Sequence, residues 1–117
     1  MVITFLKSKI AHATITQAEL YYEGSITIDE DLLKAVDVIP GEKVEVLNIN
    51  TGSRIETYAI AGKSGSGVIC LNGPAARSGT MGDKVIILSY GIMEQNEARN
   101  FKTKIIHLDK KNRIEKK

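Results

Sequence analysis

Short runs of hydrophobic and β-branched residues, separated by glycine, asparagine and aspartate, dominate the pattern along the chain. Runs of this length between turn-forming residues are typical of strands in a small barrel or sandwich. So many short strands would leave exposed edges, and closure into a barrel removes them. The pattern therefore predicts a mainly β domain. Its strands are expected over residues 2–6, 10–16, 25–28, 43–49, 54–61, 68–71, 84–89 and 104–108.

Two segments have a helical pattern. Asp29 can cap a short helix that runs to Val36, because its carboxylate can accept hydrogen bonds from the free amides of the first turn. Leu32, Leu33 and Val36 then share one face. A second and weaker helical pattern covers residues 94–100. The chain is thus expected to carry short helices on a β framework.

Turn chemistry separates the predicted strands. Pro40-Gly41 follows the first helix, residues 50–52 (NTG) separate two strands, and Asn72-Gly73 offers the positive φ values of a tight reversal. The run GKSGSG at 62–67 resembles half of a phosphate-binding loop. The pattern lacks its first glycine, because Thr57 stands there, and a strand-like run follows in place of a helix. We interpret this run as a flexible turn.

Length and composition narrow the class of protein. The 117 residues, 43% of them hydrophobic, suffice for one domain, and the net charge of +2 demands neither nucleic acid nor a membrane surface as partner. No apolar run approaches the length of a membrane helix. The lone Cys70 is interpreted as a small core hydrophobe, so a reduced, cytoplasmic setting is expected. The basic tail, residues 109–117, is predicted to be a solvated end.

Sites for metals and common cofactors are poorly supported. His12 and His107 lie far apart, with no spacing of cysteine, histidine or carboxylate around them that suits a metal. A chain this short shows no phosphate-binding cup for pyridoxal phosphate. We therefore expect neither a metal nor pyridoxal phosphate.

Five segments together resemble a known family. They read KSKI at 7–10 with ATIT at 13–16, YYEGSITID at 21–29, NxGxRxxTY at 50–58, NGPAAR at 72–77 and GDKVII at 82–87. In this order and without gaps they resemble the pyruvoyl-dependent aspartate 1-decarboxylases. The resemblance covers about residues 2 to 108. It implies a closed six-stranded double-psi β-barrel that forms one domain over residues 1–117.

The resemblance also implies an activity. The Ser25 hydroxyl would attack the Gly24 carbonyl, and elimination would cut the chain into residues 1–24 and 25–117. The new end at residue 25 would carry a pyruvoyl group, a ketone that condenses with the amine of L-aspartate. Release of CO2 would leave β-alanine, a precursor in the biosynthesis of pantothenate and hence coenzyme A. Glycine suits the cut because it tolerates unusual backbone angles, so we expect strain there.

Roles for further residues follow from the same resemblance. Thr57 is expected to organise the cleavage site and later to contact substrate, and Tyr58 to donate a proton after CO2 leaves. Lys9 and Arg54 suit the two carboxylates of an acidic substrate. Tyr22 is expected to line the pocket. The substrate loop is expected to supply polar contacts from Asn72, Gly73, Pro74 and Ala75.

Departures from the family and alternative functions remain. Ala11-His12 stands where many relatives have His-Arg, and Pro74 replaces an alanine and removes one backbone amide. The family implies a homotetramer with active sites between subunits, and a maturation factor is left open. A non-catalytic barrel and a decarboxylase that prefers glutamate are the alternatives. A non-catalytic barrel would be expected to have lost the reactive residues, and these are present here.

Overall fold

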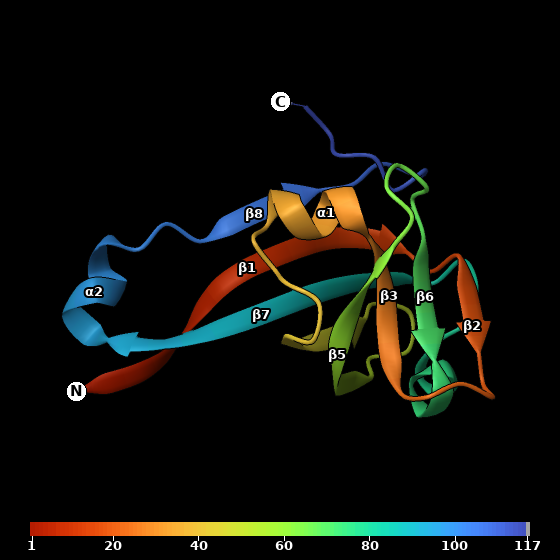
Figure 1. Cartoon of the computed structure of the whole chain (residues 1–117), viewed down its shortest axis with the longest axis horizontal. Helices are drawn as coiled ribbons and strands as arrows, with labels where there is room; N and C mark the ends of the chain where they lie inside the picture. The colour runs from red at the N-terminus through yellow and green to blue at the C-terminus, as the bar shows by residue number, and fades with distance from the viewer. Residues whose placement is uncertain (117) are drawn as a thin grey trace.

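The computed structural model describes residues 1–116, which form strands joined by short helices (Figure 1). In chain order the elements are β1 (Val2–Thr14), β2 (Gln17–Glu19), β3 (Ser25–Asp29), α1 (Glu30–Ala35), β4 (Lys43–Asn48), β5 (Arg54–Gly62), β6 (Ile69–Asn72), the 3₁₀ helix η1 (Gly73–Ser78), β7 (Lys84–Glu94), α2 (Gln95–Asn100) and β8 (Lys104–His107). Within residues 1–116, the helices are all too short or too polar to span a bilayer.

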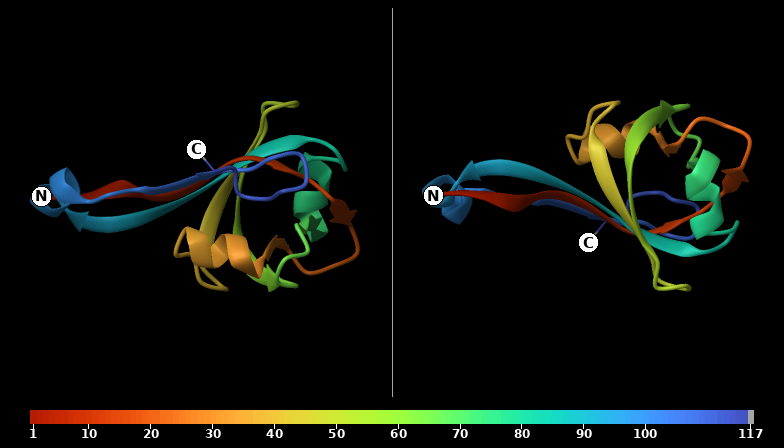
Figure 2. Two further views of the ribbon diagram at one scale, coloured as in Figure 1. Left: turned by 90° about the horizontal axis from the view of Figure 1, so that it is seen from above. Right: turned by 90° about the horizontal axis from the view of Figure 1, so that it is seen from below.

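The strands form one sheet that curls into a barrel. Their order is β2-β6-β3-β5-β4-β7-β1-β8, and β2 follows β1 after only Ile15 and Thr16. At this junction the Thr16 amide donates to the Ile69 carbonyl at 2.8 Å, and the Ile69 amide donates to Thr16 Oγ1 at 3.0 Å. The junction between β1 and β2 is thereby tied to β6, and Figure 2 shows the strands curling around a common centre. The expected mainly β barrel with short helices is confirmed. The hydrogen-bonded sheet contains eight strands where six were expected, and within residues 1–116 no ladder joins its end strands β2 and β8.

Alternation along the strands fills the barrel. Ile26 and Ile28 of β3 and Ile69 and Leu71 of β6 are almost completely buried, because every second side chain of a strand points to the core. Helix α1 covers the core with its buried leucines. Asp29 caps it as predicted, with its carboxylate accepting from the Asp31 amide at 2.9 Å.

Two strands extend beyond the barrel and form an arm. β1 is a single strand where two were predicted, because a β-bulge between Leu6 and Ser8 lets pairing with β7 continue. β7 also runs past the predicted end to Glu94, and α2 lies at the tip of the arm (Figures 1 and 2). Val2 and Ile92 on this arm are 56% and 78% exposed. The arm therefore presents apolar surface to solvent in a single chain.

The last described residues, 109–116, differ from the solvated tail that was predicted for 109–117, and Lys117 lies outside the described residues. Asn112 is only 1% exposed, and its side chain binds the end of β1 and the loop before β6. Its Oδ1 accepts from the Thr14 amide at 2.8 Å, and its Nδ2 donates to the Thr14 and Gly67 carbonyls at 2.9 and 2.7 Å. The charges around Asn112 are exposed as expected, but the backbone between them is anchored to the barrel.

Two further elements were not predicted. β2 is short and fully exposed, so it lacks the apolar pattern that would mark a strand. Residues 73–78 form η1 in place of a tight reversal, although Gly73 has the expected positive φ of 63°. Pro74 stands in the first turn of η1, where a missing amide hydrogen costs little.

Candidate active site

The strongest polar cluster lies where β3 begins. Ser25 is 1% exposed and pairs with Asn72 of β6 across the antiparallel ladder. Nδ2 of Asn72 donates to Ser25 Oγ at 2.9 Å and to Thr27 Oγ1 at 2.9 Å. A buried serine oxygen that accepts a side-chain hydrogen bond is held in one place. The structure therefore brings together Ser25 and Asn72, two residues that the sequence singled out.

Gly73 lets the chain before Ser25 pass close to this cluster. A Cβ atom built on Gly73 would lie 2.3 Å from the Tyr22 carbonyl oxygen and 3.0 Å from the Gly24 nitrogen. No side chain fits there, and the φ of 63° disfavours one as well. Gly73 thus fixes the path of the Gly24-Ser25 peptide through the absence of a side chain.

An open cleft lies beside the same peptide. Its volume is about 390 Å³, which is at the lower end of the range for small-molecule sites. Thr57 and Tyr58 of β5 line it, and so does Gly24. Pro74 and Ala75 of η1 form a further part of the wall. Most of the residues expected at the substrate site therefore meet around Gly24 in one chain.

Position rather than composition distinguishes Ser25. Gly-Ser also occurs at 52–53 and 65–66, so the dipeptide alone identifies nothing. Ser53 is half-buried and Ser66 is exposed, each in a turn. Among these serines, Ser25 is buried against a side-chain amide and preceded by a glycine that lines a cleft.

The expected backbone strain at the cut is not observed. Neither Gly24 nor Ser25 has a positive φ. A Cβ on Gly24 would make only an ordinary contact with Pro74, at 3.7 Å. The hypothesis of a strained Gly24-Ser25 peptide is therefore not supported, and the geometry here is set by the contacts around the peptide.

The two cations expected to bind carboxylates lie apart from this cleft. Lys9 sits in the middle of β1 between Leu88 and Ile105, and Arg54 begins β5 with its Nη1 donating to Glu45 at 2.8 Å. Neither lines the cleft beside Gly24. One chain therefore does not bring Lys9 and Arg54 to Ser25.

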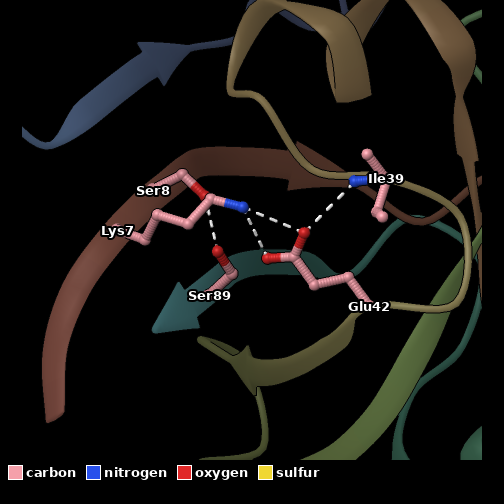
Figure 3. A network of polar contacts seen from close by, with 5 residues as sticks. All are labelled: Lys7, Ser8, Ile39, Glu42 and Ser89. Carbon is pink, nitrogen blue, oxygen red and sulfur yellow. Dashed lines mark hydrogen bonds and ion pairs between the residues drawn. The ribbon is translucent and has the colours of Figure 1, made fainter. Parts of the chain in front are cut away.

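The neighbouring lysine shows how Lys9 differs. Lys7 Nζ lies 2.9 and 2.8 Å from the two oxygens of Glu42, which also accepts from the Ile39 amide at 3.2 Å (Figure 3). Lys9 forms no ion pair with any residue in the described range 1–116. Of the two lysines on either side of Ser8, Lys9 is therefore the one whose ammonium group is not paired with a carboxylate in the described residues.

Sequence reasoning missed the polar contact of Cys70. The side chain is buried, as expected for a small hydrophobe, but its Sγ also donates to Asn72 Oδ1 at 3.2 Å. The sequence signal for this contact was the alternation of side chains along a strand, in which every second residue points to the same face. Ile69 and Leu71 point to the core, so Cys70 must share the other face with Asn72. Burial raises the pKa of the Cys70 thiol, and the negative charge of Glu19 raises it further.

The glycine-rich turn at residues 62–67 does bind an anion, but the anion belongs to the protein. The amides of Gly65 and Gly67 donate to the carboxylate of Asp29 at 3.1 and 2.8 Å. Gly65 and Gly67 both have a positive φ, so this internal partner gives the glycines of the turn a structural role. Across residues 1–116, no three side chains of the metal-binding types gather in one group.

The chain is similar over most of its length to proteins of one family. The sequence model of the family described as aspartate decarboxylase matches residues 1–115. An aspartate 1-decarboxylase of Acetivibrio thermocellus is 55% identical, covering 97% of this chain and 90% of the relative. One from Listeria monocytogenes is 56% identical, covering 96% and 88%. Among solved structures, the rationally designed mkDPBB_sym_86 protein has a TM-score of 0.49 at 19% identity, covering 66% of this chain and 90% of that one.

The family match and these relatives define the class first, because they make the chain an enzyme of the decarboxylase type. The match over nearly the whole chain then settles the family. This chain belongs to the aspartate decarboxylase family.

Proposed function

We propose that the chain cuts itself between Gly24 and Ser25 and then converts L-aspartate to β-alanine and CO2. The observation that carries this proposal is the buried Ser25 hydroxyl, held at 2.9 Å by Asn72 beside a cleft that Gly24 lines. Membership of the aspartate decarboxylase family supports the substrate. The product would feed the biosynthesis of pantothenate, in the cytoplasm.

The cut uses only groups of the chain itself. A bond forms between Ser25 Oγ and the carbonyl carbon of Gly24, and the peptide bond between the two residues breaks. The hydroxyl proton ends on the released nitrogen, so the step is an acyl shift from nitrogen to oxygen. The hydrogen bond from Asn72 Nδ2 favours negative charge on Oγ during the attack. Elimination then removes the Cα proton of residue 25 and expels the Gly24 carboxylate, which separates residues 1–24 from 25–117 and leaves dehydroalanine at residue 25. Water hydrolyses this dehydroalanine to the pyruvoyl group, and ammonia leaves.

The residues around the cut fit a ketone at the new chain end. The pyruvoyl group supplies a carbonyl that takes the substrate amine and draws electrons from the substrate as CO2 leaves. Tyr58 lines the cleft and is 40% exposed, so its phenol can reach substrate and donate a proton. Thr57 is half-buried and lines the same cleft as Gly24, which supports its expected role at the cleavage site and toward substrate.

Binding of the substrate carboxylates requires more than one chain. Lys9 and Arg54 lie outside the cleft, so in the proposed homotetramer a neighbouring subunit brings such cations to Ser25. Arg54 has donors to spare, since Glu45 takes one of the five that a guanidinium offers. Exposed apolar side chains support an assembly, among them Tyr22 near the cut and Ile92 on the arm.

Mass spectrometry of the purified protein tests the cut. We expect a fragment of residues 1–24 and a larger fragment lighter than its serine-started form by about one ammonia, the result of forming the ketone. Ser25→Ala should stay whole and release no CO2 from aspartate. Ser66→Ala is the matched control, because Ser66 also follows a glycine, and it should be cut like the wild type. Decarboxylation by uncut Ser25→Ala would refute the proposal.

Kinetics test the roles of the cations. Lys9→Gln should raise KM for aspartate by about tenfold or more, because a charge-assisted contact is lost. Lys7→Gln is the matched control, since Glu42 already pairs with Lys7, and its KM should stay close to that of the wild type. Equal changes in the two variants would remove the assignment of Lys9.

Cutting without any added protein would show that no maturation factor is needed.

A further inference from the structure

Four side chains form a polar cluster on the face of β3 and β6 that points away from the core. Ser25 lies opposite Asn72 in the antiparallel ladder, and Thr27 lies opposite Cys70. Residues two apart share a face, so all four side chains meet. Ser25, Cys70 and Asn72 are each at most 5% exposed. We call these four residues the outer quartet.

Asn72 is the centre of the outer quartet. Its Nδ2 uses both hydrogens, on Ser25 Oγ and Thr27 Oγ1, each at 2.9 Å. Its Oδ1 accepts from Cys70 Sγ at 3.2 Å. The only other acceptor recorded for the thiol, the Leu71 carbonyl, is farther away at 3.9 Å. The thiol is therefore directed at the side chain of Asn72.

The thiol decides which way the amide of Asn72 faces. A hydroxyl can both donate and accept, so Ser25 and Thr27 would tolerate either end of the amide. A thiol is a poor acceptor, and the raised pKa of Cys70 keeps its hydrogen in place at neutral pH. The amide oxygen therefore turns to Cys70, and the amide nitrogen turns to Ser25.

We propose that Cys70 is a positioning residue for the cut, because its S–H group holds Asn72 with Nδ2 facing Ser25 Oγ. This inference rests on the proposed self-cleavage. In this orientation Ser25 Oγ accepts a hydrogen bond, which stabilises the charge that develops as the hydroxyl proton leaves. If the amide of Asn72 were reversed, its oxygen would accept a hydrogen bond from the Ser25 hydroxyl. That bond would stabilise the protonated hydroxyl and so oppose the loss of its proton. Cys70 acts only through Asn72 and touches neither Gly24 nor the reacting atoms.

The rate of the cut in freshly synthesised chains tests the inference. The full chain is made by cell-free translation, and the uncut fraction is followed by mass spectrometry. Cys70→Ala should slow the cut by about fivefold to tenfold, the effect of one hydrogen bond. Cys70→Ser keeps a donor and should restore the rate to within about twofold of the wild type. Equal rates for wild type and Cys70→Ala would overturn the role of Cys70 and leave the cut itself intact.

A cycle with Asn72 separates positioning from packing. In an Asn72→Ala background, Cys70→Ala should have no further effect on the rate, since the amide it orients is gone. An undiminished effect there, or a Cys70→Ser variant as slow as Cys70→Ala, would assign Cys70 a packing role and refute the inference. If Cys70→Ala does not fold, Cys70→Val takes its place, because valine fills the site without a donor. A wild type that never cuts would refute this inference together with the proposed function.

Discussion

The buried polar side chains at the two ends of β3 are held by different kinds of hydrogen-bond partner. Each buries a polar side chain, Ser25 at the start with 1% exposure and Asp29 at the end with 2%. Ser25 is held by the side chain of Asn72, which can turn. Asp29 is held by three backbone amides. They belong to Asp31, Gly65 and Gly67.

This difference separates an end of β3 that can take part in the cut from an end that stabilises the fold. A carboxylate that accepts from three backbone amides is nearly saturated, so the Asp29 end has little left to offer a reaction. The hydroxyl of Ser25 accepts one hydrogen bond from Asn72 and, within residues 1–116, no hydrogen bond that it donates is observed, while the preceding Gly24 lines an open cleft. We therefore expect substitutions at the Ser25 end to affect cutting, and those at the Asp29 end to affect stability.

The largest effect is expected for Gly73→Ala at the Ser25 end. The new Cβ would lie 2.3 Å from the Tyr22 carbonyl oxygen, so the segment that carries the cut must move. Cutting should fall by more than about a hundredfold, since a displacement of about 1 Å costs that much. Gly52→Ala is the matched control, with a φ of 78° but nothing within 4 Å of its Cβ. Normal cutting by Gly73→Ala would contradict the proposed path of the chain.

At the other end, Asp29→Ala should cause the largest loss of stability. Three amides lose their acceptor, and that of Gly67 is buried. We expect the free energy of unfolding to fall by about 2–4 kcal/mol, measured by urea denaturation of the uncut Ser25→Ala chain. Asp31→Ala, at an exposed residue that accepts from Ser64, should cost less than about 1 kcal/mol. Equal losses would mean that the buried amides find other partners.

Asn112→Gly should give a smaller loss of stability. Glycine tolerates the φ of 58° at this position, so the change reports the three side-chain hydrogen bonds to Thr14 and Gly67. We expect a loss of about 1–3 kcal/mol in urea denaturation, with the rate of cutting unchanged. A slower cut at equal stability would show that the two ends of β3 are coupled.

The smallest expected effect is the loss of one contribution to stability at acid pH. The backbone amides of Arg113 and then Lys111 donate to Asp109, and they hold the pKa of its carboxyl below the ordinary 3.8. The unfolded chain therefore takes up the proton first as the pH falls. The contribution of Asp109 is complete above about pH 3.8 and is lost as the pH falls through the lowered pKa. The urea midpoints of wild type and Asp109→Asn should converge in acid, and a constant difference would contradict this.

Local contacts were predictable and distant ones were not. Asp29 was identified as a helix cap because its first partner is two residues away. Its bonds to Gly65 and Gly67 escaped prediction because they join positions 36 and 38 residues apart. Asn112 was placed in a solvated tail for the same reason, since its partner Thr14 is 98 residues away. At the site, Ser25 and Asn72 came from motifs, but the thiol of Cys70 required the pairing of β3 with β6.

The amino-acid sequence by itself determined the family and the mainly β fold and suggested the candidate reactive groups, because patterns of period two and short motifs lie along the chain. Only the tertiary structure decided which of the Gly-Ser dipeptides is buried, which lysine keeps a free charge and what fixes the amide of Asn72. These depend on which strands lie side by side. Hydrogen bonds act over about 3 Å in space, whatever the distance along the chain.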